Sequence, residues 1–236
     1  MKAVVFNGSG MLIDSDLSGL RLLLVKFGKE KEMLEQKRNY DKLKGSGPWG
    51  LENLARLFEG LTEKEINEKS KEIVEQNLRE EAREAIIKLK ENGFKVVCYS
   101  SELINVLNIM KGMLGLDEVY GNSLDFDKGV ATGKLKEKVD RYNRVKKIEE
   151  LMQNNNLNKK DVFIVGDSIT SVPSAQFGTL IAMNSKDEQL RQVAKFRISN
   201  LRDLFSLIKS FLIFIYISFF GGVVRSTFLK SGLLYH

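Results

Sequence analysis

Small and polar residues follow three short apolar runs of this chain. Residues 7–10 (NGSG) follow the first run, Ser100 ends the second, and Asp167 follows the third. An apolar run that breaks into small residues commonly ends a buried parallel strand beside a ligand crevice. The polar side chains at these positions are the hydroxyls of Ser9 and Ser100, the amide of Asn7 and the carboxylate of Asp167. We expect the three strand ends to bring them together.

The scarcity of histidine and cysteine excludes several kinds of chemistry. The single histidine, His236, is the last residue of the sequence, and the single cysteine, Cys98, lies inside an apolar run. A Ser-His-Asp triad, a histidine-rich zinc site and a histidine proton shuttle in the body of the fold are therefore excluded. We interpret Cys98 as a packed thiol, and the lack of an intramolecular disulfide favours a reducing, cytoplasmic location. Catalysis here must use carboxylates, amines or hydroxyls.

Strand and helix patterns alternate along most of the chain. This alternation predicts an α/β fold with a parallel sheet and helices on both faces. Residues 119–135 alternate and contain Asp-Lys-Gly, which predicts a β-hairpin. The predicted strands are 3–6, 94–101, 161–168, 179–183 and 196–198. The predicted helices are 14–27, 80–91, 102–114, 141–154, 172–177 and 201–209.

The stretch 29–79 is charged and helical, with no strand candidate. GSGPWG at 45–50 interrupts it, and Thr62 with Glu65 forms a capping-box pattern that predicts a helix start at 63. Such a stretch between two strand-forming regions is typical of a small helical cap inserted into a larger domain.

Composition and charge indicate a globular protein. Of the 236 residues, 43% are hydrophobic and 29% are charged, so disorder is not expected. The net charge is +6, but lysine and arginine alternate with glutamate along predicted helices. This pattern favours solvated helix faces, and we expect no nucleic-acid partner. The first strand is too short for a signal-peptide core, and no such peptide is expected.

The segment SFLIFIYISFFGGVV at 210–224 is uncharged and strongly apolar. It is shorter than the ~20 residues that a spanning helix needs. Three interpretations stay open: an accessory extension, a segment that contacts or spans a membrane, and an edge strand or partner surface. The sequence does not predict an oligomeric state.

Four segments, VVFNGSGML, Ser100, Arg144 and GDSITS, resemble the four motifs of the haloacid dehalogenase (HAD) superfamily, and most of all its phosphoserine-phosphatase-like branch. The resemblance covers about residues 1–209. It implies a Rossmannoid HAD-like core over 1–28 and 80–209. A small helical cap over 29–79 is inserted after the first strand and helix, and an apolar C-terminal extension occupies 210–236.

The family's site residues carry over position by position. The nucleophilic aspartate falls on Asn7 and the acid/base aspartate on Ser9. The resemblance implies that Asp167 is a metal ligand and that Ser171 stands where a second metal-supporting acid is usual. Asp16 falls where this branch has a substrate-reading glutamate. The residues implied for phosphate binding are Gly8, Gly10, Ser100 and Arg144, with Lys147 as the second candidate for the cation.

The replaced acids speak against hydrolysis. In the family a carboxylate attacks phosphorus, a second carboxylate moves the proton, and Mg²⁺ bridges the anions. Asn7 is a poor nucleophile, Ser9 is no carboxylic acid, and Asp167 alone leaves Mg²⁺ binding weakened. We expect a phosphatase-related protein, catalytically impaired, that retains a pocket for a small phosphorylated molecule.

Two alternatives stay open. The first is an active Mg²⁺-dependent phosphomonoesterase that uses rearranged acids such as Asp14, Asp16 and Asp167. The second is a protein- or membrane-interaction module that uses the cap and the segment 210–224.

Overall fold

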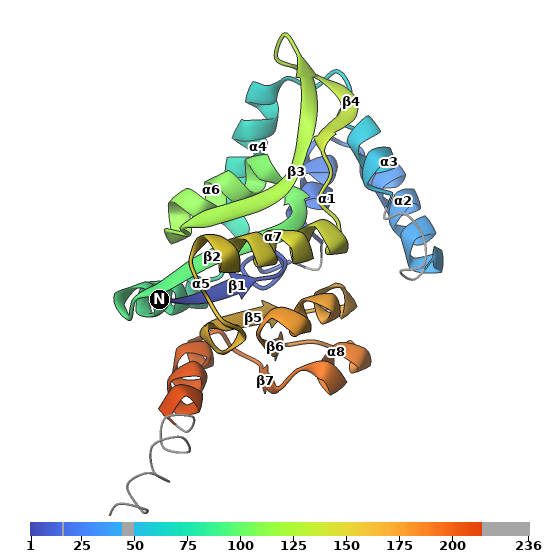
Figure 1. The fold of residues 1–236 in the computed structure, drawn as a ribbon. Helices are drawn as coiled ribbons and strands as arrows, with labels where there is room; N and C mark the ends of the chain where they lie inside the picture. The colour runs from blue at the N-terminus through green and yellow to red at the C-terminus, as the bar shows by residue number, and fades with distance from the viewer. Residues whose placement is uncertain (16, 44–49, 214–236) are drawn as a thin grey trace, which may run out of the picture.

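A computed structural model describes residues 1–15, 17–43 and 50–213 and has a seven-stranded sheet at its centre (Figure 1). The strand order is β4-β3-β2-β1-β5-β6-β7, and all neighbours are parallel except β3 and β4. The strands are β1 Lys2–Phe6, β2 Phe94–Leu103, β3 Glu118–Asp127, β4 Val130–Glu137, β5 Val162–Gly166, β6 Thr179–Met183 and β7 Phe196–Ile198. The predicted α/β fold with a parallel sheet is confirmed.

Helices cover both faces of this sheet. The α-helices are α1 Gly19–Lys26, α2 Glu30–Leu43, α3 Leu51–Arg56, α4 Glu63–Asn77, α5 Glu80–Glu91, α6 Ile104–Leu114, α7 Arg141–Asn154 and α8 Glu188–Val193. Two 3-10 helices, η1 Lys159–Asp161 and η2 Ile169–Phe177, flank β5, and a last helix spans 202–213.

The central strand β1 shows why the sheet is buried on both faces. Val4 and Phe6 belong to one hydrophobic cluster, whereas Ala3 and Val5 belong to the other, and all four are fully buried. Successive strand residues point to opposite faces, so a strand covered on both sides must be apolar throughout. This requirement explains why the continuously apolar residues 3–6 (AVVF) predicted a buried strand.

The predicted insertion forms α2, α3 and α4, and the β3–β4 hairpin joins it on one side of the sheet (Figure 1). The Ala131 N–H donates to the Leu61 carbonyl at 2.8 Å, and the Gly60 N–H donates to the Ala131 carbonyl at 3.0 Å. Phe58 and Ile66 share their hydrophobic cluster with the core strands. Backbone hydrogen bonds and a shared hydrophobic cluster therefore join the helical insertion to the hairpin and to the core.

Helix α1 begins five residues later than the predicted start at 14. The Asp14 N–H donates to the Asn77 carbonyl at 2.7 Å, and the Arg79 N–H donates to the Leu12 carbonyl at 3.0 Å. These bonds hold residues 12–14 as an extended connection beside the end of α4. The predicted start was wrong because residue 14 pairs with a segment that is distant in the sequence and is therefore not helical.

The last described helix continues past its predicted end at 209 as far as 213. Phe211 packs edge-on against Phe196 at 5.2 Å and Phe163 at 6.3 Å between ring centroids. The rest of the segment 210–224, residues 214–224, lies outside the described part, as does the rest of the predicted C-terminal extension to residue 236. Within the described part, no helix combines the length and apolarity needed to cross a bilayer.

The capping box of α4 allows a direct stability test. The Thr62 hydroxyl accepts the Glu65 N–H at 3.2 Å, and Glu65 accepts the Thr62 N–H at 2.9 Å. Thr62→Ala is expected to lower the free energy of unfolding by about 1 kcal/mol in urea titrations. Glu75→Ala on the same helix removes only an exposed contact with Lys71, and its effect should stay below about 0.5 kcal/mol. Equal effects of the two changes would contradict the role of the cap.

Candidate functional site

The carboxyl ends of β1, β2 and β5 enclose a cavity of about 420 Å³ beneath the helical insertion. Its lining includes most of the residues that the sequence singled out, namely Asn7, Gly8, Ser9, Gly10, Ser100, Arg144 and Asp167. In a parallel sheet these strand ends share one edge, so residues that are far apart in the sequence face a common space. Their proposed roles remain predictions, but their proximity is a property of the fold.

Asn7 lies at the floor of the cavity and is 1% exposed. Its backbone N–H continues the ladder to the Val165 carbonyl at 2.8 Å, and its side-chain Nδ2 donates to Ser174 Oγ at 2.7 Å. The Oδ1 atom is buried without a hydrogen-bond partner. The side-chain nitrogen of Asn7 thus fixes the amide, whereas the side-chain oxygen makes no hydrogen bond.

Two glycines give the first loop its shape. Gly8 has φ +138°, a conformation that side chains rarely adopt. A Cβ on Gly10 would lie 2.6 Å from Asp167 Oδ2, so only glycine lets the loop approach that carboxylate. The Gly8 carbonyl also accepts a long bond from Cys98 Sγ at 3.7 Å. Burial raises the pKa of the Cys98 thiol to about 12, which makes it unreactive near neutral pH.

Arg144 reaches the cavity from α7 and is 2% exposed. Its Nη1 donates to the Asn7 carbonyl at 3.2 Å and its Nη2 to the Thr170 carbonyl at 3.3 Å. Burial lowers the pKa of Arg144 to about 10, with Asp167 acting in the opposite direction, so the guanidinium stays charged at neutral pH. Burial raises the pKa of Asp167, and Arg144 counteracts that rise. The pair brings one cation and one anion to the same cavity.

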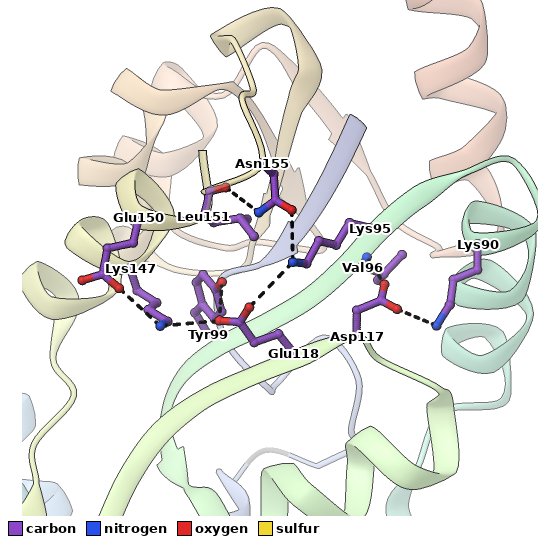
Figure 2. A network of polar contacts seen from close by, with 10 residues as sticks. All are labelled: Lys90, Lys95, Val96, Tyr99, Asp117, Glu118, Lys147, Glu150, Leu151 and Asn155. Carbon is purple, nitrogen blue, oxygen red and sulfur yellow. Dashed lines mark hydrogen bonds and ion pairs between the residues drawn. The ribbon is translucent and has the colours of Figure 1, made fainter. Parts of the chain in front are cut away.

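Lys147, the second candidate for the cation, is not among the residues that line the cavity. Figure 2 shows it between Glu150 and Glu118, with Nζ–oxygen distances of 3.3 Å and 3.6 Å. The Tyr99 hydroxyl donates to the same Glu118 carboxylate at 2.9 Å. Of the two cations that the sequence left open, only Arg144 faces the cavity.

Three other predicted residues have different outcomes. Ser171 is fully buried and donates to the Asn7 carbonyl at 3.2 Å, but it does not line the cavity. Asp14, named for rearranged catalysis, is 74% exposed and pairs with Arg79 at 2.9 Å. It lies outside the cavity lining, which contradicts that part of the alternative. Asp16 falls outside the described residues.

Among the cavity residues that the sequence did not predict, which include Arg21 on α1, Glu102 is the buried carboxyl group. It is 1% exposed, lines the cavity and accepts a bond from Ser9 Oγ at its Oε2 over 3.3 Å. The sequence reading placed a helix start at 102, whereas β2 continues to Leu103. An acidic residue inside YSSELINVL, where nearly every neighbour is apolar or small, was the available signal.

The donor set fits Mg²⁺ poorly. In the described part of the chain, no three His, Cys, Asp or Glu side chains are grouped to hold a metal ion. At the family's metal position, Asp167 offers one carboxylate and Asn7 one neutral amide oxygen. Magnesium in proteins is usually held by one or two carboxylates together with waters and substrate phosphates, so a single carboxylate lies at the lower limit. The charged Arg144 already offsets the negative charge of Asp167.

The fold and the cavity define an α/β protein with a ligand crevice at the carboxyl edge of its sheet, covered by a helical insertion. The profile of the family described as haloacid dehalogenase-like hydrolase matches residues 10–176. The chain therefore belongs to this family.

Similar proteins support the phosphoserine-phosphatase-like branch. A phosphoserine phosphatase of Archaeoglobus fulgidus is 32% identical over 163 residues, which is 67% of this chain and 46% of that protein. The chain thus matches slightly less than half the length of this curated relative.

Solved structures agree on the fold. The apo form of a phosphoserine phosphatase has a TM-score of 0.72 at 23% identity, covering 88% of this chain and 98% of that one. The phosphoserine phosphatase from T. onnurineus has a TM-score of 0.63 at 25% identity, covering 89% and 95%.

Proposed function

We propose that this chain binds the phosphoryl group of a small phosphorylated molecule in the cavity and does not hydrolyse it. The observation that carries the proposal is Asn7: at the end of β1, where the family has its nucleophilic carboxylate, stands a buried amide held by Ser174. An amide is a very poor nucleophile toward phosphorus. Removal of a nucleophile commonly costs several orders of magnitude in rate.

The polar groups around the cavity support anion binding. The Gly8–Gly10 backbone, the Ser100 hydroxyl and the Arg144 guanidinium all line it. Backbone N–H groups of such a loop, together with a guanidinium, suit phosphate oxygens. Burial raises the pKa of Asp167, the nearby Arg144 guanidinium counteracts that rise, and its positive charge also attracts an incoming anion.

A calorimetric and thermal test uses inorganic phosphate as the probe. Phosphate at about 100 times Kd is expected to raise Tm by about 5–10 °C. Ser100→Ala should weaken phosphate binding about tenfold because one hydroxyl donor is lost. Lys147→Ala, which lies outside the cavity, should leave Kd unchanged. Absence of any phosphate binding would overturn the proposal.

The parallel activity assay uses p-nitrophenyl phosphate and phosphoserine with added Mg²⁺. We expect turnover at the background of the buffer, which is the second half of the proposal. Turnover that Asp167→Asn abolishes would instead establish the alternative, an active phosphomonoesterase. That alternative is favoured by the Archaeoglobus relative, whose name states the activity.

The proposal also includes the cellular location of the protein and its contact with membranes. The single cysteine is buried and unreactive, which supports a reducing, cytoplasmic location. A membrane contact by 210–224 remains a prediction, to be tested by sedimentation with anionic vesicles before and after truncation at 213.

A further inference from the structure

Glu102 is a buried carboxyl group for which the proposed function has no use. Its Oε2 lies 3.3 Å from Ser9 Oγ, and Ser100 Oγ lies 3.4 Å from the same Ser9 hydroxyl. Both serines line the cavity, and Ser100 is the proposed phosphoryl contact. Two hydroxyl groups that line the cavity therefore connect the proposed phosphoryl contact to one carboxyl group.

The remaining contacts of Glu102 fix its orientation. Its Oε1 accepts the Leu103 N–H at 3.0 Å, and the carboxyl also accepts the backbone N–H groups of Gly19 and Leu20 at the start of α1. A Cβ on Gly19 would lie 3.0 Å from Glu102 Oε2, so glycine at this position lets the helix start approach. An acid or base that a third group orients toward a hydroxyl is the arrangement found in nucleophile–base pairs.

Burial adjusts the proton affinity of this group. Burial raises the pKa of Glu102, and the three backbone N–H groups and Arg21 lower it only in part. A raised pKa is the direction in which the pKa of a general-acid carboxyl is adjusted.

We propose that Glu102, acting through the Ser9 hydroxyl, is the proton donor and acceptor of this cavity, in place of the missing aspartate at position 9. The proposal rests on the proposed phosphoryl binding and adds that the cavity retains a group for proton transfer, whereas the carboxylate at position 7 is missing. Aspartate at position 7 should then be sufficient to start hydrolysis.

The chemistry of the Asn7→Asp variant balances as follows. The introduced carboxylate attacks phosphorus, and the bond from phosphorus to the leaving oxygen breaks. Ser9 gives its proton to that oxygen and takes the proton of Glu102. In the second half, water attacks the phosphorus of the acyl phosphate and its proton returns through Ser9 to Glu102. Phosphate and the carboxylate at position 7 are released.

The test compares two substrates in the Asn7→Asp background with Mg²⁺ added, because the change supplies a second carboxylate. Phosphoserine has a poor leaving group that needs a proton, whereas p-nitrophenolate leaves without one. Adding Glu102→Gln should lower kcat/KM for phosphoserine about 100-fold and for p-nitrophenyl phosphate less than about tenfold. A merely structural role of Glu102 would lower both rates equally.

Two further variants keep the outcome decisive. Ser9→Ala removes the connecting hydroxyl but leaves Glu102 in place, and it should reproduce the selective loss even if Glu102→Gln fails to fold. Ser9→Asp, added to Asn7→Asp and Glu102→Gln, should restore phosphoserine turnover.

If Asn7→Asp binds phosphate but hydrolyses neither substrate, or if both substrates are affected equally, the inference about Glu102 is wrong while phosphoryl binding stands. If neither the original chain nor Asn7→Asp binds phosphate, the proposed function fails first.

Discussion

Arg144→Ala is expected to abolish measurable phosphate binding and to lower the free energy of unfolding by about 3 kcal/mol. The guanidinium is buried and donates to the carbonyls of Asn7 and Thr170, so it connects the loop after β1 to the start of η2. Its loss leaves the neighbouring Asp167 without the cation that opposes its raised pKa. Urea titration measures the stability, and calorimetry with phosphate measures the affinity.

The matched control is Lys147→Ala, one helical turn further along α7. Lys147 is 31% exposed on its side chain and pairs with Glu118 and Glu150, as Figure 2 shows. Exposed pairs contribute about 0–1 kcal/mol, so its removal should be mild. Arg144→Lys keeps the charge but not the two-pronged geometry, and we expect it to recover part of the stability and little of the affinity. If Arg144→Ala and Lys147→Ala behaved alike, the assignment of the cation would be wrong.

The sequence predicted the sheet well because the sheet imposes a strict requirement. Strands covered on both faces must be continuously apolar, and residues such as Val4 and Ile164 satisfy this on each face. The predicted strands 179–183 and 196–198 match β6 and β7 residue for residue. The hairpin was predictable because alternation and a tight turn are local properties.

The two errors that bear on the site concern long-range contacts. The start of α1 was misplaced because residues 12–14 pair with the end of α4, which no local pattern shows. Glu102 was missed for the same reason: its partners Ser9 and Gly19 are distant in the sequence. The sequence does not show whether a glutamate is buried or which groups donate hydrogen bonds to it. The sheet topology predicts where the motif residues lie, whereas a residue such as Glu102, which could take over a missing role, is found only in the structure.

The difference between motif residues and compensating residues affects what is expected of the catalytic groups in this cavity. The motifs alone predict that both catalytic carboxyl groups, the nucleophile and the acid/base, are missing. The structure adds a second carboxyl group, Glu102, within hydrogen-bond distance of the changed position 9. If Glu102 replaces the acid/base at position 9, Asn7→Asp alone is expected to give hydrolysis. If both catalytic carboxyl groups are lost, Asn7→Asp alone is expected to give none.

Gly166→Ala is the second change for which a large effect is expected. A Cβ on Gly166 would collide with both Oγ and Cβ of Ser171, which donates to the Asn7 carbonyl at 3.2 Å. Relief requires η2 to move, and η2 carries the Thr170 carbonyl that accepts from Arg144. Overpacking of this kind costs about 1–3 kcal/mol, and displacement of Asp167 and Thr170 should weaken phosphate binding at least about tenfold.

The control for Gly166→Ala is the same substitution at Gly112, an exposed position inside α6 with open space around its Cα. There alanine should raise the free energy of unfolding by about 0.5–1 kcal/mol, because it restricts the unfolded chain and suits a helix. Ser171→Gly removes the atoms that a Cβ at 166 would meet, so adding it to Gly166→Ala should recover part of the lost stability. Urea titrations of the four chains test this, and a Gly166→Ala variant as stable as the original would show that η2 yields without cost. Because η2 contacts both Asn7 and Arg144, recovery of stability and recovery of phosphate affinity should occur together in the double variant.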